Sequence, residues 1–180
     1  MGAGILPVAL YRGTLFILLG QERHNNLWCD FGGRPNKGEK PIDTAIREGA
    51  EELNGFLGSE EVLNKTVNRN MILSISYDKY TTYIYRTKYD KNLPIYFSNV
   101  NKFAELQLKD KIDNRHNGLF EKKQIKWYTI KELNDKKTKA TLRIHYQELV
   151  KTIIKNERFI ITTINKLKHI DDEDEVPPKE

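Results

Sequence analysis

The stretch that most constrains the fold of this chain is residues 33–53, GRPNKGEKPIDTAIREGAEEL. Its first part is rich in glycine and proline and predicts a loop, and Pro41 suits the first turn of a helix that occupies the rest. On such a helix Glu48 lies one turn from both Glu51 and Glu52, so three carboxylates share one edge. Like charges at this spacing cost about 0.2–0.5 kcal/mol per pair. Because Mg²⁺ takes oxygen ligands, a divalent cation would remove that cost, and the stretch predicts a metal site.

The length and composition of the chain predict a single globular domain. Its 180 residues, 38% of them hydrophobic and 31% charged, are enough for one domain with a core and too few for two. We place that domain at residues 1–170. Residues 171–180, DDEDEVPPKE, hold six acidic residues against one lysine and are expected to form a disordered acidic tail.

The net charge of +5 is unevenly distributed. Residues 171–180 account for −5, which leaves +10 on residues 1–170 and predicts attraction to polyanions. No apolar run approaches the roughly 18 residues that span a bilayer, so we expect no membrane partner and a cytoplasmic location. Cys29 is the only cysteine, which excludes an intramolecular disulfide. No feature of the sequence indicates an obligatory protein partner.

Hydrophobic patterning predicts strands in four parts of the chain. We expect two hairpins, at residues 4–20 and 70–89, because each range holds two apolar or β-branched runs joined by a short polar turn. A short strand is expected at residues 28–31, and a late strand ends with IKWY at residues 125–128.

The helices are expected mainly in the second half of the chain. Residues 90–98 contain Pro94 and predict a connection, which leads to a short helix at residues 100–112. From Thr138 the spacing of apolar residues predicts one long helix. Residues 157–170 fit either a continuation of that helix or a terminal strand.

The spacing of residues 33–52 resembles the signature of the Nudix hydrolase family. Five residues separate Gly33 from Glu39, seven separate Glu39 from the pair Arg47-Glu48, and two separate that pair from Glu51-Glu52. Four acidic positions are matched at once, so the pattern is far more specific than a lone glycine motif.

Two positions depart from the family pattern. Gly49 stands where an apolar side chain is typical, and Asn54 stands where a glycine is typical, with Gly55 one residue later. These changes affect how the helix packs and ends and leave the carboxylates in place.

The resemblance implies both a fold and a reaction. The implied fold is α/β (α+β), a mixed β-sheet sandwiched between helices with a long C-terminal helix. The implied reaction is hydrolysis of a phosphoanhydride bond with Mg²⁺ or Mn²⁺ as cofactor. Such a site neutralises phosphate oxygens and supplies an aligned water.

The resemblance also assigns roles to individual residues. Glu48, Glu51 and Glu52 would hold the metal together with the backbone carbonyl of Gly33, and Glu51 or Glu52 would act as general base. Glu39 and Arg47 would form an ion pair that braces the loop against the helix.

Two alternatives to these roles remain open at this point. Arg47 pairs equally well with Glu51 at i, i+4 on an ordinary acidic helix surface, although this leaves the spacing of Gly33 and Glu39 unexplained. Glu121 lies shortly before the late strand, where the family often has a further metal ligand or base, and it fits a surface glutamate equally well.

The substrate is less constrained than the reaction. Within the family the chain loosely resembles the decapping and diphosphoinositol enzymes, including those of large DNA viruses, for which the location would be the host cytoplasm. The first hypothesis is therefore the 5′ cap of mRNA, with capped RNA as partner; the alternatives are dinucleoside polyphosphates or diphosphoinositol polyphosphates, and, in another class, an idle module that only binds RNA. The basic residues expected at the substrate, unless they merely form a solvated face, are Lys122, Lys123, Lys126, Lys139 and Arg143.

Overall fold

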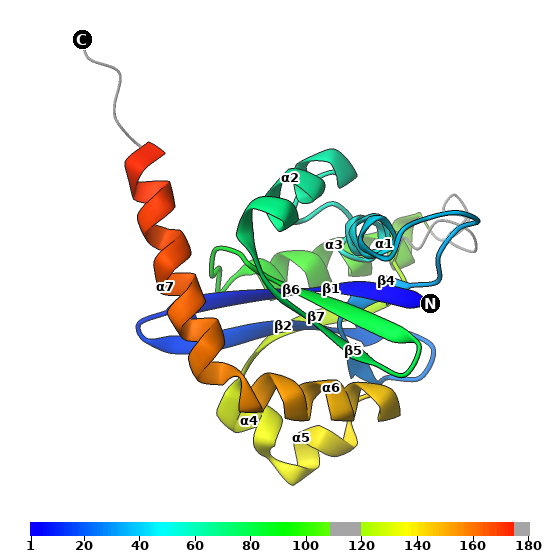
Figure 1. The fold of residues 1–180 in the computed structure, drawn as a ribbon. Helices are drawn as coiled ribbons and strands as arrows, with labels where there is room; N and C mark the ends of the chain where they lie inside the picture. The colour runs from blue at the N-terminus through cyan, green and yellow to red at the C-terminus, as the bar shows by residue number, and fades with distance from the viewer. Residues whose placement is uncertain (109–119, 175–180) are drawn as a thin grey trace.

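The structure, a computed structural model, describes residues 1–108 and 120–174, with side chains described as far as residue 167. Within these residues a seven-stranded sheet forms the centre of the molecule (Figure 1). Its strands are β1 (Gly2–Tyr11), β2 (Thr14–Glu22), β3 (Trp28–Cys29), β4 (Phe31–Gly33), β5 (Met71–Tyr77), β6 (Tyr80–Arg86) and β7 (Lys122–Thr129). The helices are α1 (Pro41–Glu52), α2 (Glu60–Asn70), α3 (Leu93–Gln107), α4 (Ile130–Asn134), α5 (Lys136–Ala140), α6 (Ile144–Lys155) and α7 (Glu157–Asp174).

The sheet is mixed and is arranged around β1. The strand order is β3-β2-β1-β6-β5, with β4 also paired to β1 and β7 also paired to β2. Strand β1 is antiparallel to β2 and β4 and parallel to β6. Both predicted hairpins are present, as β1–β2 and β5–β6. The first turn has Arg12 at φ 50° and Gly13 at φ 78°, the two left-handed positions of a type I′ hairpin turn.

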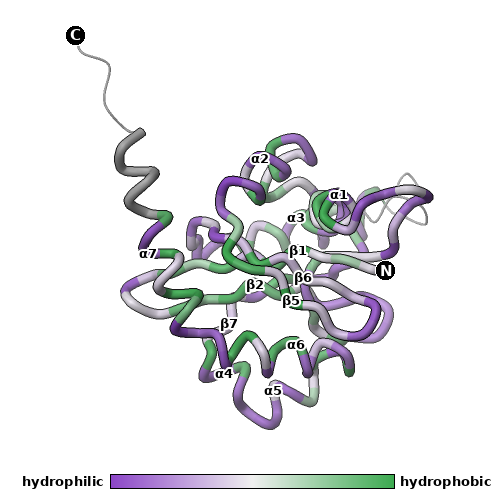
Figure 2. The backbone as a smooth tube through the Cα atoms, viewed as in Figure 1, coloured by the Kyte–Doolittle hydropathy of each residue, from purple (hydrophilic) through white to green (hydrophobic). Residues whose placement is uncertain are grey.

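Helices cover both faces of the sheet, so the predicted sandwich is confirmed. Figure 1 shows α1, α2 and α3 on one side and α4, α5 and α6 on the other, with α7 crossing beside them. Figure 2 shows hydrophobic segments gathered in the sheet and on the helices against it. One apolar cluster, which includes Ile5, Phe31 and Ile46, packs under α1 to α3, and a second, which includes Leu6, Tyr146 and Ile153, packs under α4 to α7.

Two helices on the α1 side differ from the sequence prediction. Helix α3 begins at Leu93, seven residues before the predicted start at 100, because Pro94 lies in its first turn, where the missing N–H costs nothing. The end of the predicted range, residues 109–112, lies outside the described residues. Helix α2 was not predicted, although Ser59 caps it and Glu60 and Glu61 fill its first turn.

The prediction of one long helix from Thr138 is wrong, since the structure breaks it into α5, α6 and α7. The first break occurs where Leu142 forms a β-bridge with Trp28. The Trp28 N–H donates to the Thr141 carbonyl and the Arg143 N–H donates to the Trp28 carbonyl. Arg143 therefore adopts an extended ψ of 142° and helical hydrogen bonding cannot continue through it.

The C-terminal segment is helical. Of the two alternatives for residues 157–170, the structure forms the helix, α7, whose backbone continues to Asp174. The predicted acidic tail at 171–180 thus overlaps the end of α7, and residues 175–180 lie outside the described residues. None of the described helices has the length and apolarity that a membrane span requires.

Candidate active site

The position of α1 on the sheet depends on Gly49. A Cβ atom at this residue would collide with the end of the Ile5 side chain, which is fully buried in β1. The family-atypical glycine therefore lets α1 lie close against β1, while Ala45 and Ile46 fill the rest of the contact. The edge of α1 that carries Glu48, Glu51 and Glu52 therefore lies over β4. We call it the carboxylate edge.

Glu48 lies directly against the backbone of β4. A Cβ atom on Gly33 would be 2.6 Å from the carboxyl carbon of Glu48, so only a glycine leaves room for this carboxylate. Arg47 Nη1 lies 3.1 Å from Glu48 Oε1. Burial nevertheless raises the pKa of Glu48, and nearby Glu121 and Glu39 act in the same direction.

The ion pair predicted between Glu39 and Arg47 is present. Arg47 donates from Nε to Glu39 Oε1 at 2.8 Å and from Nη2 to Oε2 at 3.0 Å, while Thr44 Oγ1 donates to the same carboxylate. Arg47 Nη2 also donates to the Arg34 carbonyl at 3.1 Å. The hydrogen bonds from Arg47 lower the pKa of Glu39 to about 2. This pair fastens the loop after β4 to α1.

Arg47 also contacts Glu51, as the alternative i, i+4 pairing required. The distance from Nη1 to Glu51 Oε2 is 3.4 Å, longer than the contacts with Glu39. Burial raises the pKa of Glu51, with Arg47 opposing and Glu48 adding to the rise. The Arg47 guanidinium thus partly offsets the negative charge of three carboxylates, those of Glu39, Glu48 and Glu51.

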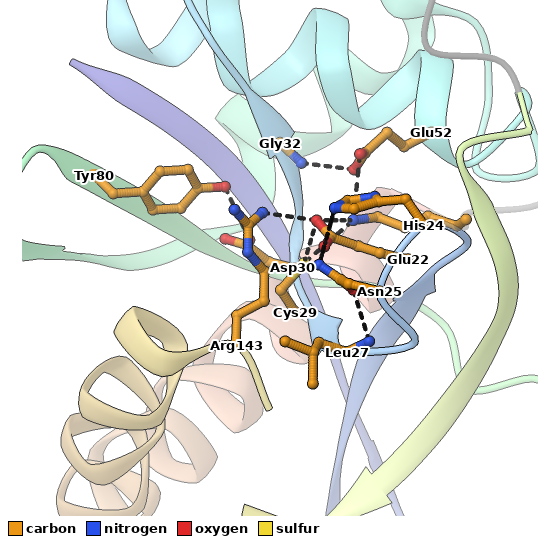
Figure 3. Close-up of polar contacts among 11 residues, drawn as sticks. Glu22, His24, Asn25, Leu27, Cys29, Asp30, Gly32, Glu52, Tyr80 and Arg143 are labelled. Carbon is orange, nitrogen blue, oxygen red and sulfur yellow. Dashed lines mark hydrogen bonds and ion pairs between the residues drawn. The ribbon is translucent and has the colours of Figure 1, made fainter. Parts of the chain in front are cut away.

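Glu52 is the most deeply buried of the three α1 carboxylates, and Figure 3 shows it next to Gly32. Its Oε2 accepts a 2.8 Å hydrogen bond from the Gly32 N–H, and its Oε1 lies 3.2 Å from Lys122 Nζ. Burial raises the pKa of Glu52 to about 8, although the Lys122 charge opposes the rise. A carboxylate offers about four acceptor sites, so these two contacts leave further capacity.

Glu121 is exposed and precedes β7. Its negative charge raises the pKa of both Glu48 and Glu52, which places it in the field of the α1 carboxylates. It lines a hollow of about 330 Å³ together with Arg23, His24 and Phe120. Glu121 therefore lies close enough to the α1 carboxylates to affect their charge, and its role as a metal ligand or base stays a prediction.

The donor chemistry of this site fits a hard divalent cation. All the groups are carboxylate or carbonyl oxygens. The pKa values of Glu48, Glu51 and Glu52 are raised chiefly by burial and further by neighbouring carboxylates, and Arg47 and Lys122 oppose the rise. In the described part of the chain, however, no three His, Cys, Asp or Glu side chains already converge on a single point.

The basic residues predicted for the substrate do not form one exposed cluster. Lys122, which was predicted to contact the substrate, is fully buried, and its ammonium group points inward to Glu52. Arg143 Nη1 lies 2.7 Å from Glu22 Oε1, and Lys126 Nζ lies 3.2 Å from Glu132 Oε1.

The other two predicted basic residues are also engaged. Lys123 Nζ contacts the Asn26 side chain, and Lys139 Nζ donates to the Asn134 side chain at 2.8 Å. Lys139 and Arg143 lie on the α4–α6 side, and neither lines the hollow next to Glu121.

Sequence reasoning missed the polar residues below the carboxylate edge (Figure 3). Glu22 is buried at the end of β2, and Asp30 is buried between β3 and β4. Asp30 accepts from Tyr80 at 2.9 Å and from Thr82 at 2.7 Å, yet burial still raises its pKa to about 6. A signal existed, because Asp30 interrupts an otherwise apolar strand, WCDF.

Two further hollows extend from this site along α3 and β7. One, of about 520 Å³, is lined by polar and charged residues that include Arg23, Lys102 and Lys123. The next, of about 560 Å³, has a more apolar lining that includes Ile95 and Tyr128. Neighbouring hollows share lining residues and so lie next to one another, and we call the three together the α3–β7 groove.

Comparison with known proteins identifies the family of the chain. The family model described as NUDIX domain matches residues 2–149. Among solved structures, a Caenorhabditis elegans Ap4A hydrolase binary complex is 14% identical, with 84% of this chain and 93% of that chain covered and a TM-score of 0.49. The Nudix hydrolase RenU of M. smegmatis is 13% identical, with 87% and 85% covered and a TM-score of 0.48.

A third structure is the NUDIX domain of Shewanella oneidensis NrtR complexed with ADP ribose, which is 12% identical, with 87% of this chain and 86% of that chain covered and a TM-score of 0.43. No curated protein matches the chain significantly. The family match spans every residue of the carboxylate edge, together with Glu39, Arg47 and Glu121. The chain belongs to the NUDIX domain family and is a Nudix hydrolase that acts on phosphoric anhydrides.

Proposed function

We propose that this chain uses a divalent cation, Mg²⁺ or Mn²⁺, to hydrolyse a phosphoanhydride bond in a small nucleotide-linked substrate. The observation that carries the proposal is the carboxylate edge of α1. Glu48, Glu51 and Glu52 follow one another along it, Glu48 lies against Gly33, and Glu121, just before β7, acts on the edge electrostatically. Such an array of partly compensated carboxylates is expensive unless it binds a cation.

Each residue has a distinct part in the proposed reaction. Glu48, Glu51, Glu52 and the Gly33 carbonyl would hold the cation, which when bound neutralises phosphate oxygens and lowers the pKa of a coordinated water. Glu39 and Arg47 are positioning residues, because their ion pair holds the loop after β4 against α1.

Exposed Glu121 is our choice for the general base. It lies at the open side of the site and lines a hollow that a water molecule can enter, whereas Glu52 is buried and Glu51 contacts Arg47. A base must lie within hydrogen-bond reach of the water it activates. The sequence favoured Glu51 or Glu52 as the general base and left Glu121 open as a further metal ligand or base.

Two observations favour a small substrate over a long RNA. The basic residues expected to track a phosphate backbone are buried or engaged with other side chains of the chain itself. The α3–β7 groove consists of hollows of about 330, 520 and 560 Å³, the size range of small-molecule sites.

The lining of the groove also suits a nucleotide. It changes from acidic at Glu121, through basic at Arg23 and Lys123, to apolar at Ile95 and Tyr128. A dinucleoside polyphosphate, with its reacting phosphate, further phosphates and base, matches that order. Decapping of mRNA remains the alternative, and it is favoured by the charge of +10 on residues 1–170.

A panel of substrates tests the proposal. Diadenosine tetraphosphate, ADP-ribose, a diphosphoinositol polyphosphate, oxidised dGTP and capped RNA would be compared by kcat/KM with Mg²⁺ and with Mn²⁺. We expect cation-dependent hydrolysis, the highest kcat/KM for diadenosine tetraphosphate, and a shallow dependence on salt.

The same panel separates the alternatives. A preference for capped RNA, with a rate at low substrate that falls steeply as salt rises, would replace the small substrate with RNA. The absence of cation-dependent turnover on every member of the panel would instead support a catalytically idle module.

A further inference from the structure

Lys122 is a lysine whose entire side chain is buried. It begins β7, and its relative exposure is 0%. Its aliphatic stem passes Gly20 of β2, where a Cβ atom would lie 2.9 Å from Lys122 Cδ and 2.8 Å from the Phe31 ring. A larger residue at position 20 would fill this space. Gly20 therefore allows the Lys122 stem to reach the interior.

The ammonium group of Lys122 ends among acidic partners. Its Nζ lies 3.2 Å from Glu52 Oε1, 3.2 Å from Cys29 Sγ and 3.8 Å from Glu22 Oε1. A buried charge costs several kcal/mol unless it is well paired, and here both carboxylates compensate it. Lys122 has no route to a substrate in solvent.

Lys122 is itself held from the opposite side of the sheet. Arg143, just before α6, places Nη1 2.7 Å from Glu22 Oε1, the same oxygen that faces Lys122. The order Arg143, Glu22, Lys122, Glu52 forms what we call the charge chain, which is buried at Glu22, Lys122 and Glu52 and partly exposed at Arg143. It connects the start of α6 through β2 and β7 to the end of α1.

We propose that Lys122 is a positioning residue for the active site, whose ammonium group sets the direction in which the Glu52 carboxylate faces the bound cation. The proposal rests on the proposed function for the role of Glu52. Lys122 fixes Oε1, and the Gly32 N–H fixes Oε2. The remaining acceptor sites of Glu52 therefore have a defined direction before a cation binds.

A purely structural role for Lys122 makes a different prediction. If the lysine only compensates buried charge, its replacement lowers stability, and any effect on activity is independent of Glu52. If it acts through Glu52, its effect disappears once Glu52 has lost its charge. Partners that orient metal ligands typically contribute 10–100-fold to metal affinity or activity.

The test is a double-mutant cycle of Lys122→Met and Glu52→Gln, read by hydrolysis rate and by Mn²⁺ affinity in a direct binding titration. We expect Lys122→Met to weaken Mn²⁺ binding and lower kcat by roughly 10–100-fold, with the larger change in kcat than in KM. In the Glu52→Gln background the same substitution should change neither quantity by more than about twofold. Lys65→Met, which removes an exposed lysine of α2, is the control expected to match the wild type.

Several results would overturn the proposal. Equal losses from Lys122→Met in both backgrounds would show a structural role, and so would unchanged Mn²⁺ affinity or a wild type that binds no Mn²⁺. If Lys122→Met does not fold, Lys122→Arg and Glu22→Gln replace it in the test. Both variants must then weaken Mn²⁺ binding, and each by less than Glu52→Gln does. The Mn²⁺ titration needs no substrate, so a wild type without hydrolytic activity would contradict the proposed function and leave this test decisive.

Discussion

The glutamates of the site are chemically identical residues that the fold places in contrasting surroundings. Glu39 is bound by Arg47 and its pKa is lowered to about 2, whereas Glu52 is buried and its pKa is raised to about 8. Hydrogen bonds to a carboxylate favour the ion, while burial disfavours it. Glu39 is therefore suited to a permanent ion pair, and Glu52 to a site that binds an additional positive charge.

The ion pair of Glu39 should show itself in the pH dependence of stability. Its folded pKa is below its usual value of 4.5, so its contribution is complete above about pH 4.5 and is lost as pH falls toward 2. We expect Glu39→Gln to lower the free energy of unfolding by about 1.5–3 kcal/mol at pH 7, and the difference from the wild type to shrink below pH 4. Urea denaturation between pH 7 and pH 3 measures this.

The matched control for that experiment is Glu61→Gln. Glu61 pairs with Lys65 at 2.8 Å, but both side chains are more than three-quarters exposed, so its loss should change stability by less than about 0.5 kcal/mol at any pH. A Glu39→Gln effect that stays constant from pH 7 to pH 3 would contradict the assignment of the pair.

Sequence spacing could predict the pairing of Glu39 and Arg47 but not the burial of Lys122. The first depends on a loop and a helix within one short stretch, where the spacing limits the geometry. The second depends on a gap at Gly20, on a different strand, and on the burial of one lysine out of the run KKQIK. Neighbouring lysines in a strand carry no mark of which one faces inward until the pairing of β2 with β7 is known.

At the scale of elements, the packing of α1 on β1 decides where the carboxylates lie. Gly49 lowers the intrinsic helix preference of α1 by about 0.5–1 kcal/mol relative to alanine, yet it removes the clash with Ile5. Close packing therefore outweighs helix propensity at this position.

Substitution of Gly49 tests this balance. Alanine would gain up to about 1 kcal/mol of helix propensity and lose about 1–3 kcal/mol by overpacking, so we expect Gly49→Ala to destabilise the protein by up to about 2 kcal/mol. In an Ile5→Ala background, where the clash is absent, the same substitution should be neutral or stabilising. Urea denaturation of the four proteins gives both values, and an equal loss in both backgrounds would show that Ile5 is not the obstacle.

The helices after β7 show where local patterning stops being informative. The apolar spacing from Leu142 to Ile153 is helical, and most of that stripe is buried in α6 as expected. The break before α6 comes from backbone hydrogen bonds between Trp28 and residues more than 100 positions away. A local pattern contains no information about that contact.

At the scale of the whole molecule, the fold brings distant segments to one site. Helix α1 supplies the carboxylate edge, and β4 lies against it. Strand β7 follows Glu121 and supplies Lys122, and α3 lies along the α3–β7 groove. The layered fold and the reaction class could be predicted from residues 33–53 and the strand pattern. The groove could not, because α3 and β7 meet only after the sheet has formed.

The most direct test of the account is the dependence of diadenosine tetraphosphate hydrolysis on Mg²⁺ concentration for the wild type, Glu48→Gln and Glu61→Gln. Loss of a residue that holds the cation should exceed the 10–100-fold typical of outer partners. We predict that Glu48→Gln lowers kcat/KM by more than about 100-fold and shifts the Mg²⁺ requirement upward, while Glu61→Gln matches the wild type. A Glu48→Gln protein with wild-type rate and wild-type Mg²⁺ dependence would contradict the assignment of the carboxylate edge of α1 as the active site.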